Sequence, residues 1–346
     1  MEENRRKQLR WQLPFLLLLI AGTVFVVRQQ HDTPYRKCSG MIFGTVYNIA
    51  YQHADDLQKD IEAELATVDA TFSMFNDQSI VSRLNRGEQD VQLTSMFTEV
   101  FSLANTISDD TGGAFDITVG PLVNAWGFGF KNEQMPSKAQ VDSLLQLVGM
   151  RLLTLSSDAR TLSKANPRVT LDFSAIAKGY GSDVVARLLR KKGIENFMVE
   201  IGGEVVTSGV NASRLPWRIG VTKPTEDSLS TGSQELQTVL NVTDRAMATS
   251  GNYRNFYYKG GRKYAHTIDP HTGYPVQHSI LSATVLAPNC ATADAYATSF
   301  MVMGMERARE VLDRHPELMA YFIYSDADGQ LAVWFSPQLK GKILDE

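Results

Sequence analysis

Residues 169–204, VTLDFSAIAKGYGSDVVARLLRKKGIENFMVEIGGE, show most directly which fold class this chain adopts. The part from about residue 175 to 192 predicts a helix, and Gly193 is expected to end it. The apolar run 197–201 that follows is typical of a buried strand, and residues 169–171 are expected to form a short strand ahead of the helix. A single short stretch therefore combines both kinds of element.

Outside this stretch, helices and strands are predicted in a mixed order. Helices are expected at 57–75, from Thr94 to about residue 110, at 137–145, at 291–303 and at 305–314. Strands are expected at 42–50, 217–221, 237–243, 255–258 and 281–287, with a closing hairpin of 319–324 and 331–335. Because strict alternation would predict a doubly wound sheet, this order favours an α+β fold of mixed or antiparallel sheets with packed helices.

The composition predicts a globular protein that does not bind nucleic acid. With 346 residues, 43% of them hydrophobic, the chain is long enough to bury a large core. Its formal net charge of −4 argues against nucleic acid as a partner, because binding nucleic acid requires a basic face. No linker is evident between residues 40 and 340, which predicts one domain there.

The N-terminus carries a separate signal. Arg5, Arg6, Lys7 and Arg10 come before an uncharged run that extends to Val27. The run is at the short limit for a transmembrane helix, and its basic flank would stay in the cytoplasm. These features favour an uncleaved membrane anchor over a cleaved signal segment.

This interpretation divides the chain into three parts. Residues 1–28 are the membrane anchor or signal segment, 29–39 a linker and 40–340 the domain, which would lie outside the cytoplasm. Cys38 follows basic residues rather than the small apolar residues of a lipoprotein cleavage site, which argues against a lipid anchor. A disulfide is permitted outside the cytoplasm, but no pairing of Cys38 with Cys290 is predicted.

Residues 264–273, YAHTIDPHTG, are the strongest candidate for proton-transfer chemistry. His266 and His271 lie in this stretch and His278 follows closely, although the chain has only 6 histidines. Histidine is suited to proton transfer near neutral pH, and the proline and glycine of the stretch would fix a tight turn. The alternative is a surface hairpin turn that happens to contain histidine.

Glycine-rich residues 112–121 and 126–129 form a second candidate. Glycines let backbone N–H groups approach a ligand closely, and Phe115 or Trp126 would stack on a flat ring. The alternative is a helix stop followed by a glycine-rich loop.

The stretch 171–181, LDFSAIAKGYG, is a candidate phosphate site. Asp172 lies between the expected strand and helix, and Lys178 would lie one turn into the helix, whose N-terminus favours anions. The alternative is that Asp172 caps the helix. In residues 200–204, EIGGE, either the backbone approaches a ligand or two strands pack closely, and the structural interpretation is preferred.

The stretch 293–299, ADAYATS, is a candidate metal site. Asp294 and Thr298 are four residues apart and share one face of the predicted helix, whose other residues are mostly small and apolar. A buried aspartate needs a partner or a cation, and these oxygen ligands suit Mg²⁺. Alternatively, Asp294 caps the helix and Thr298 bonds within its own turn. Zinc, nucleophile-elbow and Walker-type signatures are absent from the sequence.

In order along the chain, these stretches resemble one family, the FAD:protein FMN transferases or ApbE flavin transferases. The resemblance covers about residues 39–340. It is carried by 39–45 (SGMIFGT), 113–123 (GAFDITVGPLV), 172–180 (DFSAIAKGY), 201–203 (IGG), 249–253 (TSGNY), 266–270 (HTIDP) with 272–273 (TG), and 293–298 (ADAYAT). Seven ordered motifs make chance agreement negligible, whereas each motif alone would be weak evidence.

The resemblance implies a Mg²⁺-dependent enzyme at the bacterial inner membrane, with its catalytic domain on the periplasmic side. It would transfer FMN from FAD to a threonine hydroxyl of an acceptor protein and release AMP. The implied acceptors are subunits of Na⁺-translocating NADH:quinone reductase and of Rnf-type complexes. The implied fold is an α+β domain related to the T-fold.

The resemblance also assigns site residues. Contacts to FAD would come from Met41, Phe75, Ala114, Phe115, Asp116, Asp172, Lys178 and Ile268. Magnesium would be held by the Ala175 carbonyl, Asp294 and Thr298. Some relatives carry a second aspartate where this chain has Ala297, and some carry glutamate in place of Lys178.

His266 is the preferred candidate for the base that would take the proton of the acceptor hydroxyl, with a nearby carboxylate as the second candidate. Two alternatives stay open. Water could replace the acceptor, which would make the protein an FAD pyrophosphatase giving FMN and AMP. The protein could also be a non-catalytic flavin-binding protein.

Overall fold

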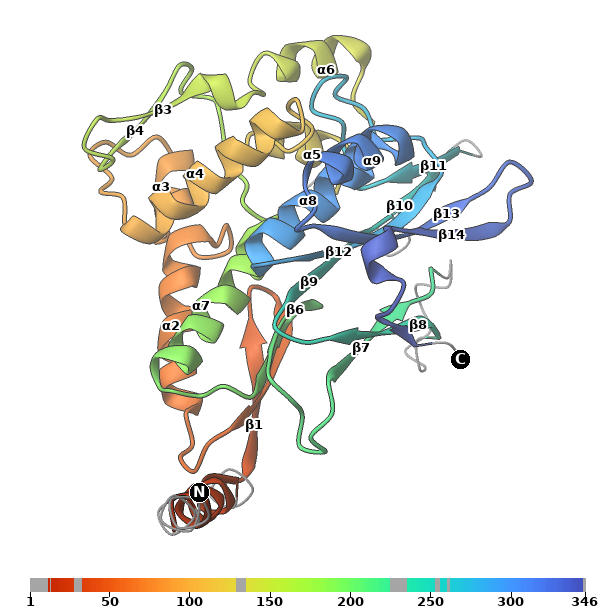
Figure 1. Ribbon diagram of the computed structural model, residues 1–346. Helices are drawn as coiled ribbons and strands as arrows, with labels where there is room; N and C mark the ends of the chain where they lie inside the picture. The colour runs from red at the N-terminus through yellow and green to blue at the C-terminus, as the bar shows by residue number, and fades with distance from the viewer. Residues whose placement is uncertain are drawn as a thin grey trace, which may run out of the picture.

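The main sheet has eight strands in the described part of the chain, and each neighbouring pair is antiparallel (Figure 1). The computed structural model describes residues 12, 14–27, 33–128, 135–224, 235–252, 256–259 and 262–344, with the backbone alone at 256–259 and 262–265. In spatial order the strands are β1 (Tyr35–Ile42), β2 (Thr45–Gln52), β5 (Phe197–Ile201), β6 (Glu204–Ser208), β9 (Ala246–Gly251), β12 (Ile280–Ala287), β13 (Met319–Ser325) and β14 (Leu331–Phe335).

Smaller elements surround this sheet. A three-stranded sheet contains β15 (Ile343–Leu344), β8 (Leu236–Val242) and β7 (Trp217–Thr222). Two hairpins are formed by β3 (Leu153–Leu155) with β4 (Leu162–Lys164) and by β10 (Phe256–Lys259) with β11 (Arg262–Ala265). The helices are α2 (Gln58–Phe72), α3 (Ile80–Asn85), α4 (Ser95–Asp110), α5 (Gly120–Ala125), α6 (Lys138–Leu145), α7 (Ala177–Lys191), α8 (Cys290–Met303) and α9 (Met305–Arg314), with short 3-10 turns at Met150–Leu152 and Pro337–Leu339.

The two faces of the main sheet are covered differently. Helix α8 packs on β9 and β12, α7 packs on β5 and α8, and α2 packs on α7. The other face meets the small sheet, where Leu240 and Val242 of β8 pack against Leu286 and Met319 of the main sheet. Burying such apolar side chains contributes about 1.5–3 kcal/mol each. The α+β fold with antiparallel sheets that the sequence predicts is confirmed.

Helix ends follow local sequence signals closely. Thr94 caps α4 by accepting a hydrogen bond from the Phe97 N–H, as the sequence predicts. Ser137 and Gln140 form a capping box at α6. The predicted helix 57–75 ends early, at Phe72, because the Ser73 backbone turns extended.

Two further expectations from the sequence, a strand at 169–171 and a linker at 29–39, differ from the structure. Residues 169–171 form no strand: the Leu171 N–H bonds the Asn85 side chain instead of a neighbouring strand. The segment 29–39 is not all linker, because β1 begins at Tyr35 and pairs with β2 along its whole length. Cys38 is buried on β1, and both Cys38 and Cys290 are free thiols.

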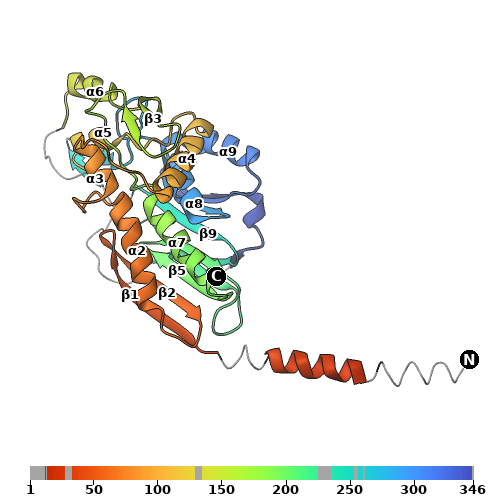
Figure 2. The ribbon, with the colours of Figure 1, turned by 90° about the vertical axis from the view of Figure 1, so that its left-hand side faces the viewer.

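The N-terminal segment lies apart from the domain. Residues 14–27 are helical and their side chains are exposed (Figure 2). Within the residues that the structure describes, no helix has the length and apolar character needed to cross a membrane. The basic residues Arg5, Arg6, Lys7 and Arg10 lie outside the described residues.

Candidate functional site

A cavity of about 970 Å³ brings most of the candidate residues together. This volume is at the upper end of the range for small-molecule sites. Of the site residues assigned from the sequence, those that line it are Ala114, Phe115, Asp116, Asp172, Ala175, Lys178, His266, Ile268, Asp294 and Thr298. Met41, on β1, and Phe75, after α2, are not in its lining, and their exposed fractions are 70% and 73%.

The glycine-rich loop supplies one wall of the cavity. Gly112 and Gly113 both adopt positive φ, 60° and 84°, which glycine tolerates without strain. One oxygen of Asp116 accepts hydrogen bonds from the Thr118 N–H at 2.8 Å and from its hydroxyl at 2.6 Å. Burial raises the pKa of the Asp116 carboxyl. Asp116 therefore shapes the loop as well as facing the cavity.

The aromatic residues near this loop are core residues. Phe115 is buried in the largest hydrophobic cluster. Trp126 is buried in a separate cluster, outside the cavity lining, where its indole N–H donates to the Gly273 carbonyl at 2.7 Å. The proposed stacking of Trp126 on a flat ring in this cavity is therefore wrong. Gly129 lies outside the described residues.

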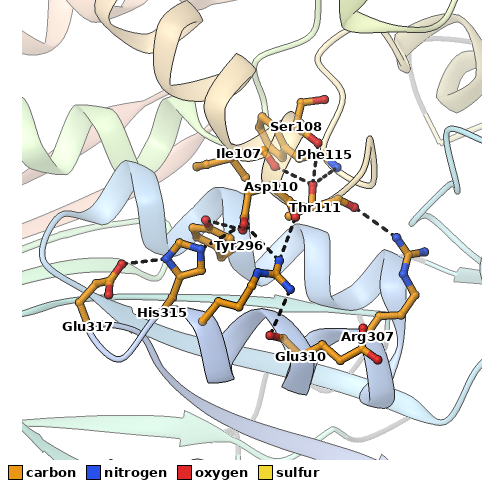
Figure 3. A network of polar contacts seen from close by, with 11 residues as sticks. Ile107, Ser108, Asp110, Thr111, Phe115, Tyr296, Arg307, Glu310, His315 and Glu317 are labelled. Atoms are coloured by element: carbon orange, nitrogen blue, oxygen red, sulfur yellow. Dashed lines mark hydrogen bonds and ion pairs between the residues drawn. The ribbon is translucent and has the colours of Figure 1, made fainter.

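A hydrogen-bond network holds the glycine-rich loop against helices α8 and α9 (Figure 3). The Thr111 hydroxyl accepts the Phe115 N–H at 3.2 Å, and the Thr111 carbonyl accepts from Arg307 at 3.2 Å. Asp110 accepts the Tyr296 hydroxyl at 2.9 Å and pairs with Arg314 and His315, both at 3.1 Å. We call Asp110, Tyr296, Arg314 and His315 the Asp110 network.

Asp172 begins a turn rather than capping a helix. Its Oδ1 accepts the Ser174 N–H at 2.9 Å, and its own N–H donates to the Ile117 carbonyl at 2.7 Å. The residue at the N-cap of α7 is Ile176, which makes no side-chain cap. The interpretation of Asp172 as a helix cap is therefore wrong, and its carboxylate faces the cavity.

Helices α7 and α8 meet where the two candidate metal segments lie. A Cβ atom on Gly179 would be 2.4 Å from the Cys290 carbonyl oxygen, so only glycine permits this approach. The Gly179 N–H donates to Asp294 Oδ2 at 3.1 Å. In a regular helix it would donate to the carbonyl four residues earlier, that of Ala175. No backbone hydrogen bond among the described residues ends on that carbonyl.

Asp294 and Thr298 lie on the cavity face of α8, as their spacing predicts. Asn289, not Asp294, caps the helix, by accepting the Thr292 N–H at 2.9 Å. Asp294 is buried, and burial raises the pKa of its carboxyl. The Thr298 hydroxyl lies 3.0 Å from the Ser250 hydroxyl. The Asp294 carboxylate, Thr298 hydroxyl and Ala175 carbonyl are the hard oxygen donors that Mg²⁺ accepts.

Sequence reasoning missed Glu204, the first residue of β6. Lys178 Nζ donates to Glu204 Oε1 at 2.5 Å, and Glu204 is only 2% exposed. Burial raises the pKa of the Glu204 carboxyl, although the Lys178 ammonium opposes the shift. Burial works against the charge of Lys178, but Asp294 and Glu204 outweigh it and raise its pKa. The sequence signal available for Glu204 was its position directly after the glycine pair at 202–203.

We call Lys178, Glu204 and Asp294 the cavity cluster. It contains two carboxylates and one cation, all lining the cavity. Across the part of the chain that the structure describes, no group of three or more His, Cys, Asp or Glu side chains is arranged to hold a metal ion. A cation here would rest on one carboxylate with neutral oxygens, an arrangement that Mg²⁺ commonly completes with substrate phosphates.

The turn at 266–273 separates its histidines. His266 lines the cavity, and its ring lies 6.4 Å from that of Phe128. His271 lies 3.1 Å from Asp269 Oδ1 and 2.8 Å from the Gly112 carbonyl, so it ties the turn to the glycine-rich loop. His278 bonds the Met301 carbonyl at 2.6 Å. Among these three, His266 alone lines the cavity.

Comparison with known proteins gives one consistent result. The family model described as "ApbE family" matches residues 43–322. An FAD:protein FMN transferase from Haemophilus influenzae is 36% identical over 327 residues, which cover 90% of this chain and 93% of the relative. One from Vibrio cholerae is 39% identical over 315 residues, which cover 88% and 90%. The solved structure of the flavin transferase ApbE from Vibrio cholerae superposes with a TM-score of 0.79 at 37% identity, covering 90% of this chain and 100% of that one.

Proposed function

This chain belongs to the ApbE family and is an FAD:protein FMN transferase, and we propose that it uses Mg²⁺ and a threonine hydroxyl of its acceptor protein. The observation that carries the proposal is the meeting of Asp294, Thr298 and the Ala175 segment with His266 in one cavity. This places hard oxygen ligands and a candidate base around the same space.

The proposed reaction forms one P–O bond and breaks another. The acceptor hydroxyl oxygen attacks the phosphorus on the FMN side of the FAD pyrophosphate, and AMP leaves with the bridging oxygen. Positioning and charge neutralisation dominate phosphoryl transfer. A Mg²⁺ ion held by Asp294, Thr298 and the Ala175 carbonyl would supply charge neutralisation on the pyrophosphate oxygens.

The chain's own residues divide the remaining tasks. His266 takes the proton of the acceptor hydroxyl as the bond to phosphorus forms. Lys178 supplies positive charge to the cavity wall for the phosphates. The Asp116 and Asp172 loops fix the walls of the cavity through their own turns, and Ile268 adds a buried apolar contact.

The direct test is a turnover assay with the purified full-length chain, FAD, Mg²⁺ and a candidate acceptor subunit. We expect the acceptor to gain the mass of FMN in a covalent bond, with release of one AMP for each. Free FMN without a modified acceptor would identify an FAD pyrophosphatase instead. Unchanged FAD would identify a non-catalytic flavin-binding protein.

We propose subunits of Na⁺-translocating NADH:quinone reductase or Rnf-type complexes as acceptors, modified on the periplasmic side of the bacterial inner membrane. The support for this location is the order of the N-terminal sequence, basic residues followed by an apolar run. Cell fractionation with mass spectrometry of the N-terminus tests this. A protein recovered in the cytoplasm would contradict the proposed location.

A further inference from the structure

The cavity cluster is hydrogen-bonded unevenly. The Lys178 ammonium donates to Glu204 Oε1, whereas Asp294 accepts from the Gly179 backbone N–H and from no described side chain. Both carboxylates are buried, and both attract the same ammonium group electrostatically. The lysine is therefore held on one side of the cluster.

This arrangement matters because an ammonium group and a divalent cation compete for a carboxylate. If Lys178 bonded Asp294 directly, it would occupy the only carboxylate of the candidate cation site and place a positive charge beside the incoming ion. An ammonium group in contact with this carboxylate would repel a cation bound to it. Repulsion between adjacent like charges in a protein interior weakens binding of the cation by more than about tenfold.

We propose that Glu204 is a positioning residue that holds the Lys178 ammonium away from Asp294 and so leaves the Asp294 carboxylate available to a divalent cation. The inference rests on the cation site of the proposed function. It concerns a residue, Glu204, that acts through Lys178 rather than by touching the reacting atoms.

The surroundings of Glu204 fit this role. The residue follows the Gly202-Gly203 turn, where both residues have positive φ, 64° and 103°, so its place on β6 is fixed by the backbone. Lys178 is the described side-chain partner of its carboxylate, and Oε2 is buried with no hydrogen bond among the described residues. Buried polar groups are normally paired, so a buried carboxylate whose second oxygen has no described hydrogen bond calls for a functional explanation.

The test measures metal binding in the full-length chain without FAD. Mn²⁺ serves as the probe because it takes the same oxygen ligands and the free ion is counted by its paramagnetic resonance signal. We expect Glu204→Gln to weaken Mn²⁺ binding by about tenfold, because Lys178 then turns to Asp294. The double variant Glu204→Gln with Lys178→Met should return to within about threefold of wild type, because the competing ammonium is gone.

Glu204→Asp separates position from charge. It keeps the negative charge but is one methylene shorter, so it should also weaken binding by at least about threefold. Glu200→Gln is the matched control: Glu200 also lines the cavity but pairs with Asn48, and its loss should change binding by less than about twofold. Melting temperatures of all variants confirm that each is folded.

The possible results distinguish a failure of the positioning role of Glu204 from a failure of the cation site itself. Wild-type affinity in Glu204→Asp, or no recovery in the double variant, would overturn the positioning role while leaving the cation site in place. Mn²⁺ binding that survives Asp294→Asn unchanged would overturn the cation site of the proposed function and the inference together.

Discussion

Helix α8 carries polar side chains in two directions, and the two groups are satisfied very differently. On one side Tyr296 joins the Asp110 network, in which Asp110 alone has partners on three side chains. On the other side Asp294 and Thr298 face the cavity, each with one described hydrogen bond. Helix α8 therefore contributes one side chain to a network whose polar groups are paired, and two side chains to a cavity in which they have few partners.

The difference shows which group stabilises the protein and which awaits a ligand. Buried polar groups are normally paired, and a fully paired network rigidifies the structure around it. A carboxylate kept buried with few partners lowers stability and is retained for binding or catalysis. The Asp110 network supports the glycine-rich loop, whereas the cavity cluster is the group that we propose takes part in the reaction.

The largest expected effect comes from Asp294→Asn. Turnover should fall by about 10³-fold, because the site loses the carboxylate that is proposed to hold the ion. The melting temperature should stay the same or rise, because a buried charge is removed. Transferase assays and thermal unfolding measure the two. Retained turnover would contradict the division between the two sides of α8.

His266→Ala should lower turnover by about 10²–10³-fold while FAD binding is retained. The matched control is His271→Ala in the same turn, whose ring bonds Asp269 and Gly112 rather than lining the cavity. The control should change turnover by less than about tenfold and mainly lower stability. Equal losses of turnover in both variants would remove His266 as the base.

Asp110→Ala should lower stability and leave turnover nearly unchanged, the opposite of the effects expected for Asp294→Asn. The change leaves Tyr296, Arg314 and His315 without a shared acceptor, so the free energy of unfolding should fall by about 1–3 kcal/mol. Turnover of the folded fraction should stay within about threefold of wild type. Urea unfolding and activity below the transition provide the measurements. A large loss of turnover with unchanged stability would contradict a supporting role.

The smallest effect concerns the pH dependence of stability. Burial opposes the charge of His315, but the hydrogen bonds that its ring donates to the Glu317 and Asp110 carboxylates outweigh burial and raise its pKa. Because the folded-state pKa lies above the unfolded one, the contribution is complete below about pH 6.5 and is lost as the pH rises through the folded-state pKa.

The corresponding variant is His315→Gln. At pH 6 the wild type should have a higher free energy of unfolding than the variant. This difference should shrink by less than about 1 kcal/mol between pH 6 and pH 8.5. An advantage that grows with pH would show that the charged form of His315 does not stabilise the fold.

Local signals predicted much of the fold. Helices α4, α6, α8 and α9 and the β13–β14 hairpin lie where periodicity and capping residues place them. Strand β9 was missed because its sequence, Ala246–Gly251, is rich in small residues with low strand propensity, and long-range pairing with β12 stabilises it instead. The apolar Val169 and Leu171 favour a strand at 169–171, yet Leu171 bonds the Asn85 side chain through both its N–H and its carbonyl.

The candidate site was predictable where chemistry follows spacing along one element. Asp294 and Thr298 are one turn apart on a single helix, so their shared face could be inferred. Glu204 could not be assigned, because its partner Lys178 is 26 residues away and reaches it only through the packing of α7 on β6. Whether Met41 and Phe75 contact FAD remains a prediction, since both are exposed outside the cavity lining.

The close contact of α7 with α8 at Gly179 has a consequence for how the site meets its ligand. Because the Gly179 backbone almost touches the Cys290 carbonyl, the two helices cannot slide past each other without a steric clash. This close packing favours a fixed relative position of the Ala175 carbonyl and the Asp294 carboxylate. For the proposed cation site, this would pre-organise the electrostatic environment, so that little reorganisation energy would be spent on binding phosphates.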